Sequence, residues 1–262
     1  MSKTTVNIIK VGGKVVENPQ ALASFLDIFA RVEGAKILVH GGGTSATAMA
    51  ARLGVATEMV EGRRVTSPEM LEVAMMVYGG LVNKKIVAGL QWRGINAVGL
   101  SGADFRVIEA HKRVGGKVDY GMVGDVDRVD GKALARLIAD GITPVLAPLS
   151  YDPSTGGFLN TNADTIASST AIAMAADPTL NVNLIFCFEK AGVLMDAEDE
   201  STVIGHINPS IAQDLIQKEI VAGGMIPKIT NALNAIEQGV NEVVITRYEA
   251  IDNSQAGTHI TA

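Results

Sequence analysis

The strongest constraint on the fold is a regular alternation of short apolar runs with helical patterns. The runs, such as VNIIKV and NLIFCF, are almost continuously apolar and lack the alternation of a half-exposed strand. They occupy residues 6–11, 35–40, 96–100, 142–149, 183–188 and 241–246. Strands covered on both faces have this pattern, and helices between them supply the crossovers of a parallel sheet. The sequence therefore predicts an α/β fold, a three-layer αβα sandwich around a mainly parallel, open sheet.

Helical patterns fill most of the intervals between these runs. We expect helices at residues 19–32, 44–53, 67–91, 131–140, 162–176, 208–220 and 227–239. The longest opens with Thr66 and, three residues later, Glu69, with Pro68 between them, a pattern that resembles a capping box.

Two further segments bear on the organisation of the chain. Residues 105–128 break the alternation with GG and YG turns, which predicts hairpins at the rim of the sheet. The polar stretch 177–183 is the best position for a boundary between two lobes. We therefore expect lobes of residues 1–180 and 181–262 that share one continuous sheet.

Composition excludes several classes of protein. The net charge is -6 and basic residues form no long cluster, so nucleic acid is not an expected partner. The single cysteine, Cys187, lies in the apolar run LIFCF, where a buried and unreactive thiol is expected. No signal peptide precedes the first strand, and no apolar segment of membrane-spanning length is free of charge or glycine. We expect a cytoplasmic protein that does not use a membrane.

Glycine-rich loops follow the first two predicted strands. Gly12 and Gly13 follow the first, and Gly41 to Gly43 follow the second and run into a helix. Ligands of open α/β sheets bind beyond the carboxyl ends of the strands, where glycine lets backbone N–H groups approach an anion closely. One such loop alone would indicate only a tight turn. Two at adjacent strand ends favour an anion site.

Two lysines from opposite ends of the chain are expected at the same crevice. Lys10 ends the first strand, and Lys228 begins a late helix. Either one alone would be read as a solvated surface charge. As a pair they could hold a phosphoryl group in transfer, which requires in-line positioning and positive charge on its equatorial oxygens. Asp164, the last residue of NTNAD, would lie between the lysines and hold them, since a free carboxylate would repel a phosphate.

Five motifs occur in a fixed order, namely IIKVGGK, VHGGG, GRRVT, NTNAD and GGMIPK. Together they resemble the amino acid kinase family, and within it the branch that phosphorylates the γ-carboxylate of an N-acylated glutamate with MgATP in arginine biosynthesis. The resemblance spans essentially the whole chain. It implies an ATP-dependent transferase whose N-terminal lobe binds the acyl-amino acid and dimerises, and whose C-terminal lobe binds ATP. The Mg²⁺ would be held mainly by phosphate oxygens and water.

The resemblance implies a catalytic or ATP-binding role for five of the motif residues. Lys10 and Lys228 would stabilise the charge on the phosphoryl group, and Asp164 would organise both amines. Gly12 and Gly13 would present N–H groups to the ATP phosphates, which Lys228 would also contact.

The remaining motif residues are implied to bind the acyl-glutamate. Gly42 and Gly43 would present N–H groups to its γ-carboxylate and to the migrating phosphate. Arg64 would clamp its α-carboxylate, since a planar fork binds a carboxylate bidentately. Asn160 would bind its backbone-like part, whereas Asn162 is expected to cap a helix. No general base is required because the attacking carboxylate is already ionised at neutral pH, and His40 is expected to be structural.

Two segments depart from the family pattern. The sequence CFEKAGVL replaces the common TDVxGVL, so Glu189 and Lys190 change the loop that would contact the nucleotide. The expected acyl pocket borders SGADFRV and the rim hairpins, where Arg106, Lys112 and Arg113 add positive charge. These cations suggest a larger or more polar acyl group, such as succinyl in place of acetyl.

The long helix at 67–91 is apolar around most of its circumference, which is typical of a buried helix. Burial in the core is one interpretation. A homodimer is the other, and we prefer it because the family's dimers pack through this helix. Arginine-inhibited relatives form hexamers through an additional N-terminal helix, which the about six residues before the first strand are too few to form. We expect a dimer that is insensitive to arginine.

Other functions stay open at this point. A member of the same family could phosphorylate carbamate, aspartate or a nucleoside monophosphate, although GRRVT followed by NTNAD favours an acyl-glutamate. A nicotinamide-dependent oxidoreductase could use Gly41, Gly43 and Ala46 as a dinucleotide fingerprint, but this match leaves both lysines without a role. A nucleotide sensor without turnover would have little need for two lysines.

Overall fold

The computed structural model describes residues 3–60, 62–196, 198–218, 220–221 and 225–262. Its centre is an eight-stranded sheet with the order β12-β14-β13-β11-β1-β2-β8-β5. The strands are β1 (Thr4–Val11), β2 (Ala35–His40), β5 (Ala97–Leu100), β8 (Thr143–Leu146), β11 (Leu180–Phe188), β12 (His206–Ile207), β13 (Glu242–Arg247) and β14 (Thr258–Ile260). Neighbouring strands are parallel except β13 and β14, which are antiparallel. The predicted mainly parallel sheet is confirmed.

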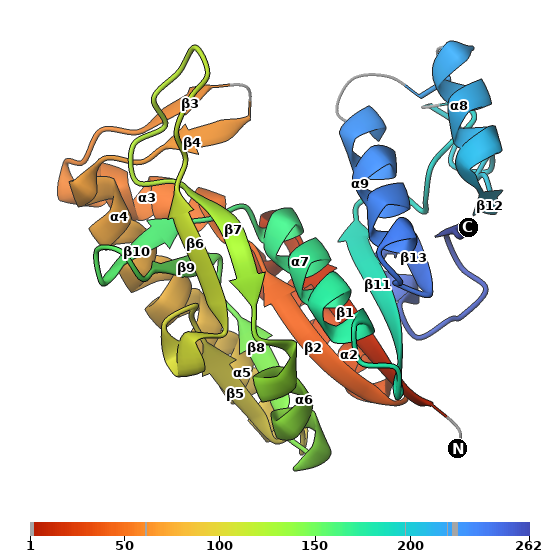
Figure 1. Ribbon diagram of the computed structural model, residues 1–262, viewed down its shortest axis with the longest axis horizontal. Coiled ribbons are helices and arrows are strands. Elements are labelled where there is room, and N and C mark those ends of the chain that lie inside the picture. The colour runs from red at the N-terminus through yellow and green to blue at the C-terminus, as the bar shows by residue number, and fades with distance from the viewer. Residues whose placement is uncertain (1–2, 61, 197, 219, 222–224) are drawn as a thin grey trace.

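Helices cover both faces of this sheet. One face carries α1 (Gly13–Glu17), α2 (Pro19–Arg31), α3 (Gly43–Leu53), and a long run made of α4 (Pro68–Ala74), a π-helical segment (Met75–Val82) and α5 (Asn83–Trp92). The other face, toward the viewer in Figure 1, carries α6 (Gly131–Ala139), α7 (Ala163–Ala175), α8 (Pro209–Gln217) and α9 (Met225–Glu237). A separate hydrophobic core fills each side. The three-layer αβα sandwich is thus as predicted.

The strand β1 contributes to both cores. Ile9 and Val11 pack in the first core, and Val6 and Ile8 pack in the second. Because side chains alternate along a strand, Lys10 emerges on the same face as Val6 and Ile8. Its place at the carboxyl end of β1 brings its amine to the beginning of α7 instead of the core interior.

Two smaller sheets lie outside the central one. A four-stranded sheet has the order β10-β9-β6-β7, made of β6 (Ile108–Lys112), β7 (Gly124–Val129), β9 (Leu149–Asp152) and β10 (Gly157–Asn160). A hairpin is made of β3 (Glu58–Val60) and β4 (Arg63–Val65). The β6–β7 hairpin falls in the predicted segment. The run 142–149 is not one strand, because Pro148 lacks an N–H for the ladder and the chain passes there from β8 to β9.

The longest helix differs from its prediction at its start and its middle. Its N-cap is Ser67, whose hydroxyl accepts a hydrogen bond from the Met70 N–H at 3.1 Å, so the capping box at Thr66 is wrong by one residue. The π-helical segment was not predicted. In the described part of the chain, the run Pro68–Trp92 has the length and composition of a membrane span, yet Met70 and Val77 are fully buried in the first core.

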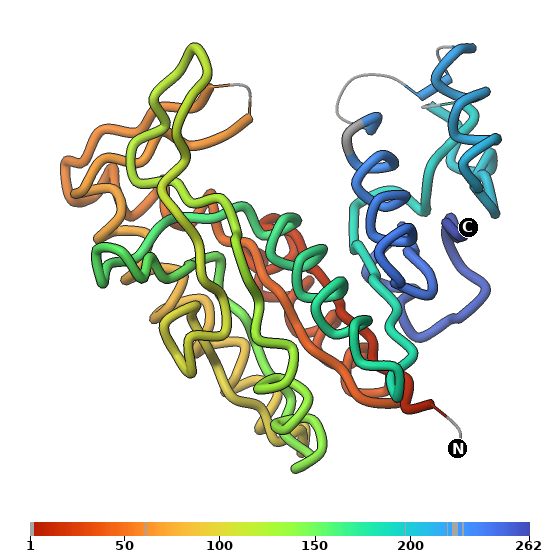
Figure 2. The backbone as a smooth tube through the Cα atoms, viewed as in Figure 1, coloured from red at the N-terminus to blue at the C-terminus, as the bar shows by residue number. Residues whose placement is uncertain are grey.

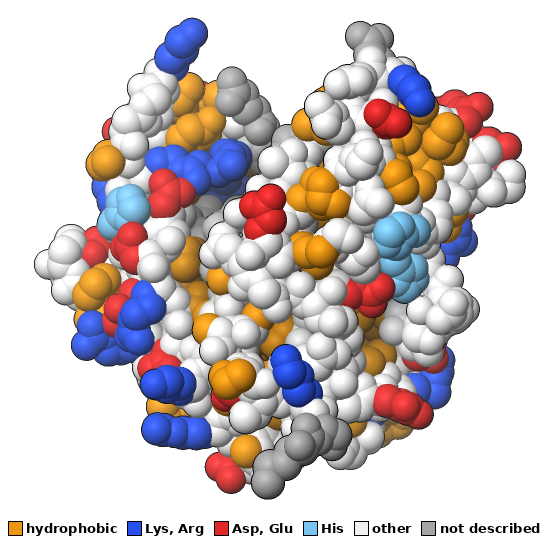
Figure 3. All heavy atoms as spheres, turned by 45° about the vertical axis from the view of Figure 1, so that its right-hand side comes forward, with side chains coloured by type: hydrophobic (Ala, Val, Ile, Leu, Met, Phe, Trp, Pro, Cys, Tyr) orange, Lys and Arg blue, Asp and Glu red, His pale blue; other side chains and the backbone are white. Residues whose placement is uncertain are grey.

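The C-terminal strands and α8 and α9 lie together on one side of β1, as the blue end of the tube in Figure 2 shows. The central sheet continues through both parts of the molecule without a break. Figure 3 shows a hollow between the two parts, with Lys and Arg side chains gathered on one of its walls. This crevice lies at the carboxyl ends of the parallel strands.

Candidate active site

An ion pair lies at the base of the crevice. The Lys10 amine is 2.8 Å from a carboxylate oxygen of Asp164, which is at the beginning of α7. The Lys10 side chain is largely buried, and that of Asp164 is one-third exposed. The structure therefore brings two of the predicted catalytic residues into direct contact across 154 positions of sequence, the difference between their numbers.

Lys228 approaches the same place from α9. Its amine lies 3.8 Å from the centre of the Phe188 ring, and the Lys10 amine lies 5.9 Å from the same point. Phe188 is the last residue of β11. In the parallel pairing of β1 with β11, Lys10 lies opposite Phe186, and Phe188 is two residues further along, so Phe188 lies on the same face of the sheet as Lys10. The sequence did not indicate Phe188, because its facing follows from the pairing of β11 with β1. The ring gives both amines one apolar, electron-rich neighbour.

The electrostatics of Lys228 reflect this proximity. Burial lowers the pKa of Lys228 below its usual value, the negative charge of Asp164 opposes that decrease, and the positive charge of Lys10 adds to it. Asp164 therefore acts on both lysines, by contact with Lys10 and through its field on Lys228. Such a pair of cations suits a ligand that brings negative charge into the crevice.

The two glycine-rich loops pack directly against one another. The Gly41 N–H donates to the Val11 carbonyl at 3.0 Å, and a Cβ atom added to Gly41 would lie only 3.0 Å from the Gly13 nitrogen. Gly12 and Gly42 occupy the N-cap positions of α1 and α3. A side chain on Gly41 would push the loops apart. The beginnings of both helices therefore lie together at the crevice, and of their first N–H groups that of Ser45 donates to a Glu17 carboxylate oxygen at 2.7 Å.

A cavity of about 210 Å³ opens on the α3 side of the crevice. Buried Arg64 lies in its wall, where one terminal nitrogen donates to the Gly43 carbonyl at 2.9 Å and to the Thr47 hydroxyl at 2.7 Å. The other terminal nitrogen, Nη1, is buried without a hydrogen-bond partner among the described residues. Tyr78 also lines this cavity, and it too was missed by the sequence analysis. The free donor of Arg64 fits a ligand carboxylate.

The NTNAD segment places one of its amides in the wall of the cavity and uses the other as a helix cap. Asn160 lines the same cavity, and its amide donates to the Thr66 hydroxyl at 3.0 Å. The Asn162 side chain instead accepts hydrogen bonds from the N–H groups of Asp164, at 2.8 Å, and Thr165, at 3.2 Å. It is the N-cap of α7, as predicted. Capping by Asn162 places Asp164 in the first turn, facing Lys10.

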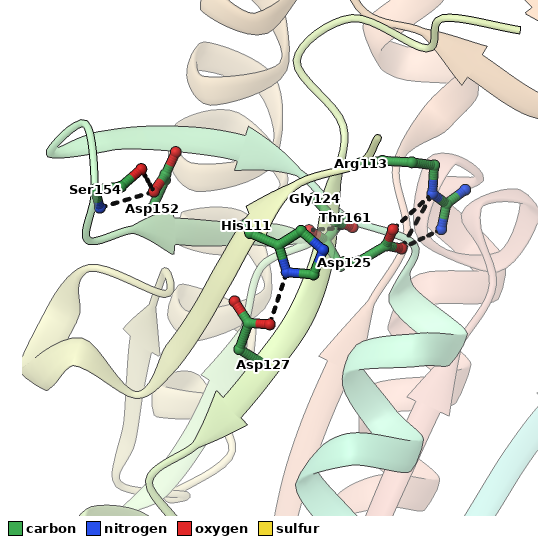
Figure 4. Close-up of polar contacts among 8 residues, drawn as sticks. All are labelled: His111, Arg113, Gly124, Asp125, Asp127, Asp152, Ser154 and Thr161. Atoms are coloured by element: carbon green, nitrogen blue, oxygen red, sulfur yellow. Dashed lines mark hydrogen bonds and ion pairs between the residues drawn. The ribbon is translucent and has the colours of Figure 1, made fainter. Parts of the chain in front are cut away.

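The rim of this cavity carries only part of the predicted positive charge. Arg113 lines the cavity and forms two 3.0 Å hydrogen bonds from Nε to the carboxylate of Asp125. Figure 4 shows this pair beside Gly124 and Thr161, with the bond between His111 and Asp127 further from Arg113. The hydrogen bond from Arg113 lowers the pKa of Asp125 most, and the charge of Arg63 lowers it further.

The other two predicted cations do not line this cavity. Arg106 pairs with Glu109 at 2.6 Å, and Lys112 is exposed in the β6–β7 hairpin. Their expected place beside the acyl pocket is therefore wrong. Arg63, in the β3–β4 hairpin that the sequence did not predict, lines the cavity in their stead.

A second cavity, of about 300 Å³, lies on the α9 side of the crevice. Gly12, Gly13 and Lys228 line it, together with Glu189 and Lys190 of the departing segment. Glu189 binds Lys14 across the cavity mouth at 2.7 Å in an exposed ion pair. The glycines numbered 223 and 224, from the motif GGMIPK, lie outside the described residues.

Neither a reactive thiol nor a cluster of metal ligands is found at this site among the described residues. Cys187 lines the second cavity but is buried, and burial raises the pKa of its thiol to about 12, so it is unreactive as predicted. Among the described residues, no group of three or more His, Cys, Asp or Glu side chains could hold a metal ion. A larger cavity, about 750 Å³, lies near Thr5 and Asn7 at the beginning of β1, away from both glycine-rich loops.

Comparison with known proteins places this arrangement in a family. Residues 5–247 match the model of the amino acid kinase family. An acetylglutamate kinase of Bacteroides fragilis is 54% identical over 258 residues, covering 98% of this chain and 97% of the relative. That of Phocaeicola vulgatus is 53% identical and covers 98% and 99%. A crystal structure of N-acetylglutamate synthase from Neisseria gonorrhoeae, complexed with coenzyme A and N-acetyl-glutamate, has a TM-score of 0.79 at 22% identity, over all of this chain and 60% of that one.

The environment of Lys228 predicts unusual amine reactivity. A lowered pKa leaves more neutral amine at a given pH, so Lys228 will react with an acylating reagent at lower pH than lysine in an unstructured peptide. The negative charge of Asp164 raises the pKa of Lys228, so Asp164→Asn will lower this pKa and the pH at which Lys228 reacts. Competitive labelling followed by mass spectrometry measures both effects, with labelling of exposed Lys85 as the control. If the pKa of Lys228 measured by labelling were unchanged or higher in Asp164→Asn, this account would be contradicted.

Proposed function

This chain belongs to the amino acid kinase family, and from that membership we propose that it transfers the γ-phosphoryl group of ATP to the γ-carboxylate of an N-acyl-L-glutamate. Such an enzyme is a phosphotransferase with a carboxyl acceptor, and its acyl phosphate product would serve arginine biosynthesis. The observation that carries the proposal is the convergence of Lys10 and Lys228 on Phe188 beside Asp164. The cavity lined by Arg64 would take the acyl-glutamate, and the cavity lined by Lys228 would take ATP.

The reaction requires positioning and charge more than acid–base chemistry. A γ-carboxylate oxygen attacks the γ-phosphorus, a carboxyl O–P bond forms, and the bond to the β-phosphate oxygen breaks to release ADP. The carboxylate is ionised at neutral pH, so no side chain must remove a proton. Lys10 and Lys228 would act where negative charge spreads over the equatorial oxygens. Asp164 would keep both amines in place before a phosphate binds.

The other motif residues would bind the substrates. Gly12 and Gly13 would direct N–H groups to the ATP phosphates, whose Mg²⁺ enters with the nucleotide as part of the substrate. Gly42 and Gly43 would direct their N–H groups to the acceptor carboxylate and the migrating phosphate.

Arg64 would use its unpaired Nη1 on the substrate α-carboxylate, and Asn160 would bind the amide part of the same molecule. We further propose that residues 1–180 form the acyl-amino-acid lobe and residues 181–262 the ATP lobe, in a cytoplasmic enzyme.

The proposed roles predict the outcome of a hydroxylamine-trapping assay with MgATP. The wild-type protein will yield a hydroxamate from an N-acyl-glutamate. Lys228→Met and Lys10→Met will each reduce kcat by about 100-fold or more while changing the KM for ATP much less, because the lost charge acts mainly in the transition state. Lys85→Met removes an exposed lysine and serves as the control. Loss of ATP affinity with unchanged kcat would contradict the catalytic role of either lysine.

A specific observation favours a second acceptor, N-succinyl-glutamate, over N-acetyl-glutamate. The cavity is lined by Arg63 and Arg113 in addition to Arg64, and Asp125 balances only one of these two further charges. N-acetyl-glutamate needs one arginine for its α-carboxylate. A succinyl group adds a third carboxylate, which an additional guanidinium would bind.

The two acyl groups can be separated by kinetics. We expect kcat/KM to be higher for N-succinyl- than for N-acetyl-glutamate, and Arg63→Met to reduce the succinyl value about tenfold or more while changing the acetyl value little, since only succinyl brings a further carboxylate to this arginine. Arg106→Met, outside the cavity, is the matched control. A clear preference of the wild-type enzyme for the acetyl compound would remove the succinyl assignment and leave the kinase reaction intact.

We also propose a homodimer that packs through the helix Pro68–Trp92. Met75, Met76 and Leu81 of this helix are exposed, with 54% of Met76 accessible, although the opposite side of the helix is buried in the first core. A second copy of the chain would cover this apolar side.

Light scattering tests this assembly directly. The wild-type protein will have the mass of a dimer, and Met76→Glu will shift it toward the monomer, because a carboxylate would be buried in an apolar contact. Arg52→Glu, on the exposed side of α3, is the control for added negative charge. A monomeric or hexameric wild-type protein would rule out the proposed dimer.

A further inference from the structure

A chain of hydrogen bonds connects α5 to the second glycine-rich loop through His40. The Asn83 amide nitrogen donates to the Val145 carbonyl at 3.0 Å and lies 3.2 Å from His40 Nε2. On the other side of the ring, His40 Nδ1 lies 2.7 Å from the Gly41 carbonyl oxygen. His40 is fully buried, and Asn83 is almost so.

The direction of each bond follows from the two backbone carbonyls. The Val145 oxygen only accepts, so the Asn83 group that faces it must be the NH₂. The same NH₂ faces Nε2, which must therefore be the unprotonated, accepting nitrogen of the ring. Nδ1 then carries the proton and donates it to the Gly41 oxygen. Burial lowers the pKa of His40 to about 4, which keeps the ring neutral and this tautomer intact near neutral pH.

We propose that His40 is a positioning residue, which directs the Gly42 N–H at the anion bound in the crevice. Carbonyl and N–H point in opposite directions across a planar trans peptide. A hydrogen bond from His40 that holds the Gly41 oxygen inward therefore holds the Gly42 N–H outward, on the side of the Gly13 loop. The inference rests on the proposed function, because the anion would be the acceptor carboxylate and the phosphoryl group in transfer.

Tyr78 contacts the next residue of this loop, Gly42. A Cβ atom on Gly42 would lie 3.1 Å from the ring of Tyr78, so the ring covers the loop there, and the φ of Gly42 is 157°. Tyr78 lies within the π-helical segment, and Asn83 immediately follows it. Single π-helical turns in α-helices are frequent at functional sites, and this one brings both contacts to the loop from one helix.

Two isosteric substitutions separate positioning from packing. His40→Asn places an amide near Nδ1 and can still donate to the Gly41 oxygen, whereas His40→Gln places its amide near Nε2 and loses that donor. We expect His40→Gln to lower kcat by about 10- to 100-fold with little change in either KM, and His40→Asn to lose about threefold or less. Thermal unfolding of both variants is the control, because both lose the buried ring. Equal losses of kcat in the two variants would show a packing role and overturn the proposal.

A second readout does not depend on turnover. In the wild-type protein and in His40→Asn, the Gly42 amide proton will shift downfield in NMR spectra on addition of inorganic phosphate, and in His40→Gln this shift will be absent. Failure of the wild-type protein to form any hydroxamate would contradict the proposed function, and the amide shift would still decide the role of His40. Absence of the shift in the wild-type protein, or its persistence in His40→Gln, would overturn the positioning role.

Discussion

The whole crevice depends on one electrostatic arrangement, in which two partly buried ammonium groups share the neighbourhood of a single carboxylate. Lys10 and Lys228 repel each other, and each loses part of its hydration beside Phe188. Asp164 offsets this cost by direct contact with one amine and by its field at the other. Removing such a carboxylate would leave positive charge uncompensated in a partly desolvated place. Two positive charges and one carboxylate leave the site with excess positive charge, which favours binding of a phosphate. The phosphate offsets the repulsion between the two lysines that Asp164 reduces only in part.

Backbone geometry prepares the site before any ligand arrives. The glycine-rich loops after β1 and β2 touch each other, so their N–H groups are held in common by the sheet and need little reorganisation when charge develops. The alternation along β1 sends Lys10 toward α7, and the Asn162 cap sets the first turn of α7 so that Asp164 faces it. Lys10 and Asp164, which we propose to be catalytic, are thus aimed by a strand and by a helix end.

The elements and the principal residues could be predicted from local patterns, because buried parallel strands and glycine-rich strand ends leave strong signals in the sequence. The layers, the parallel sheet, the β6–β7 hairpin and the cap by Asn162 follow from such signals. The short β3–β4 hairpin could not be predicted, because strands of three residues leave too little pattern, and so Arg63 was missed while Arg106 was placed wrongly. Phe188 and Tyr78 acquire their importance only from residues distant in the chain, which a single sequence does not reveal.

The π-helical segment has a consequence for how this protein can change during evolution. Its wider turns shift the rotational phase of α5 relative to α4, and the contact of Asn83 with His40 depends on that phase. Substitutions on the outer side of the helix leave this phase unchanged, although those at the proposed dimer contact would affect assembly. A deletion of one residue within the segment, however, would alter the phase and carry Asn83 off its target. We therefore expect selection on the length of this segment, with insertions and deletions rare within it.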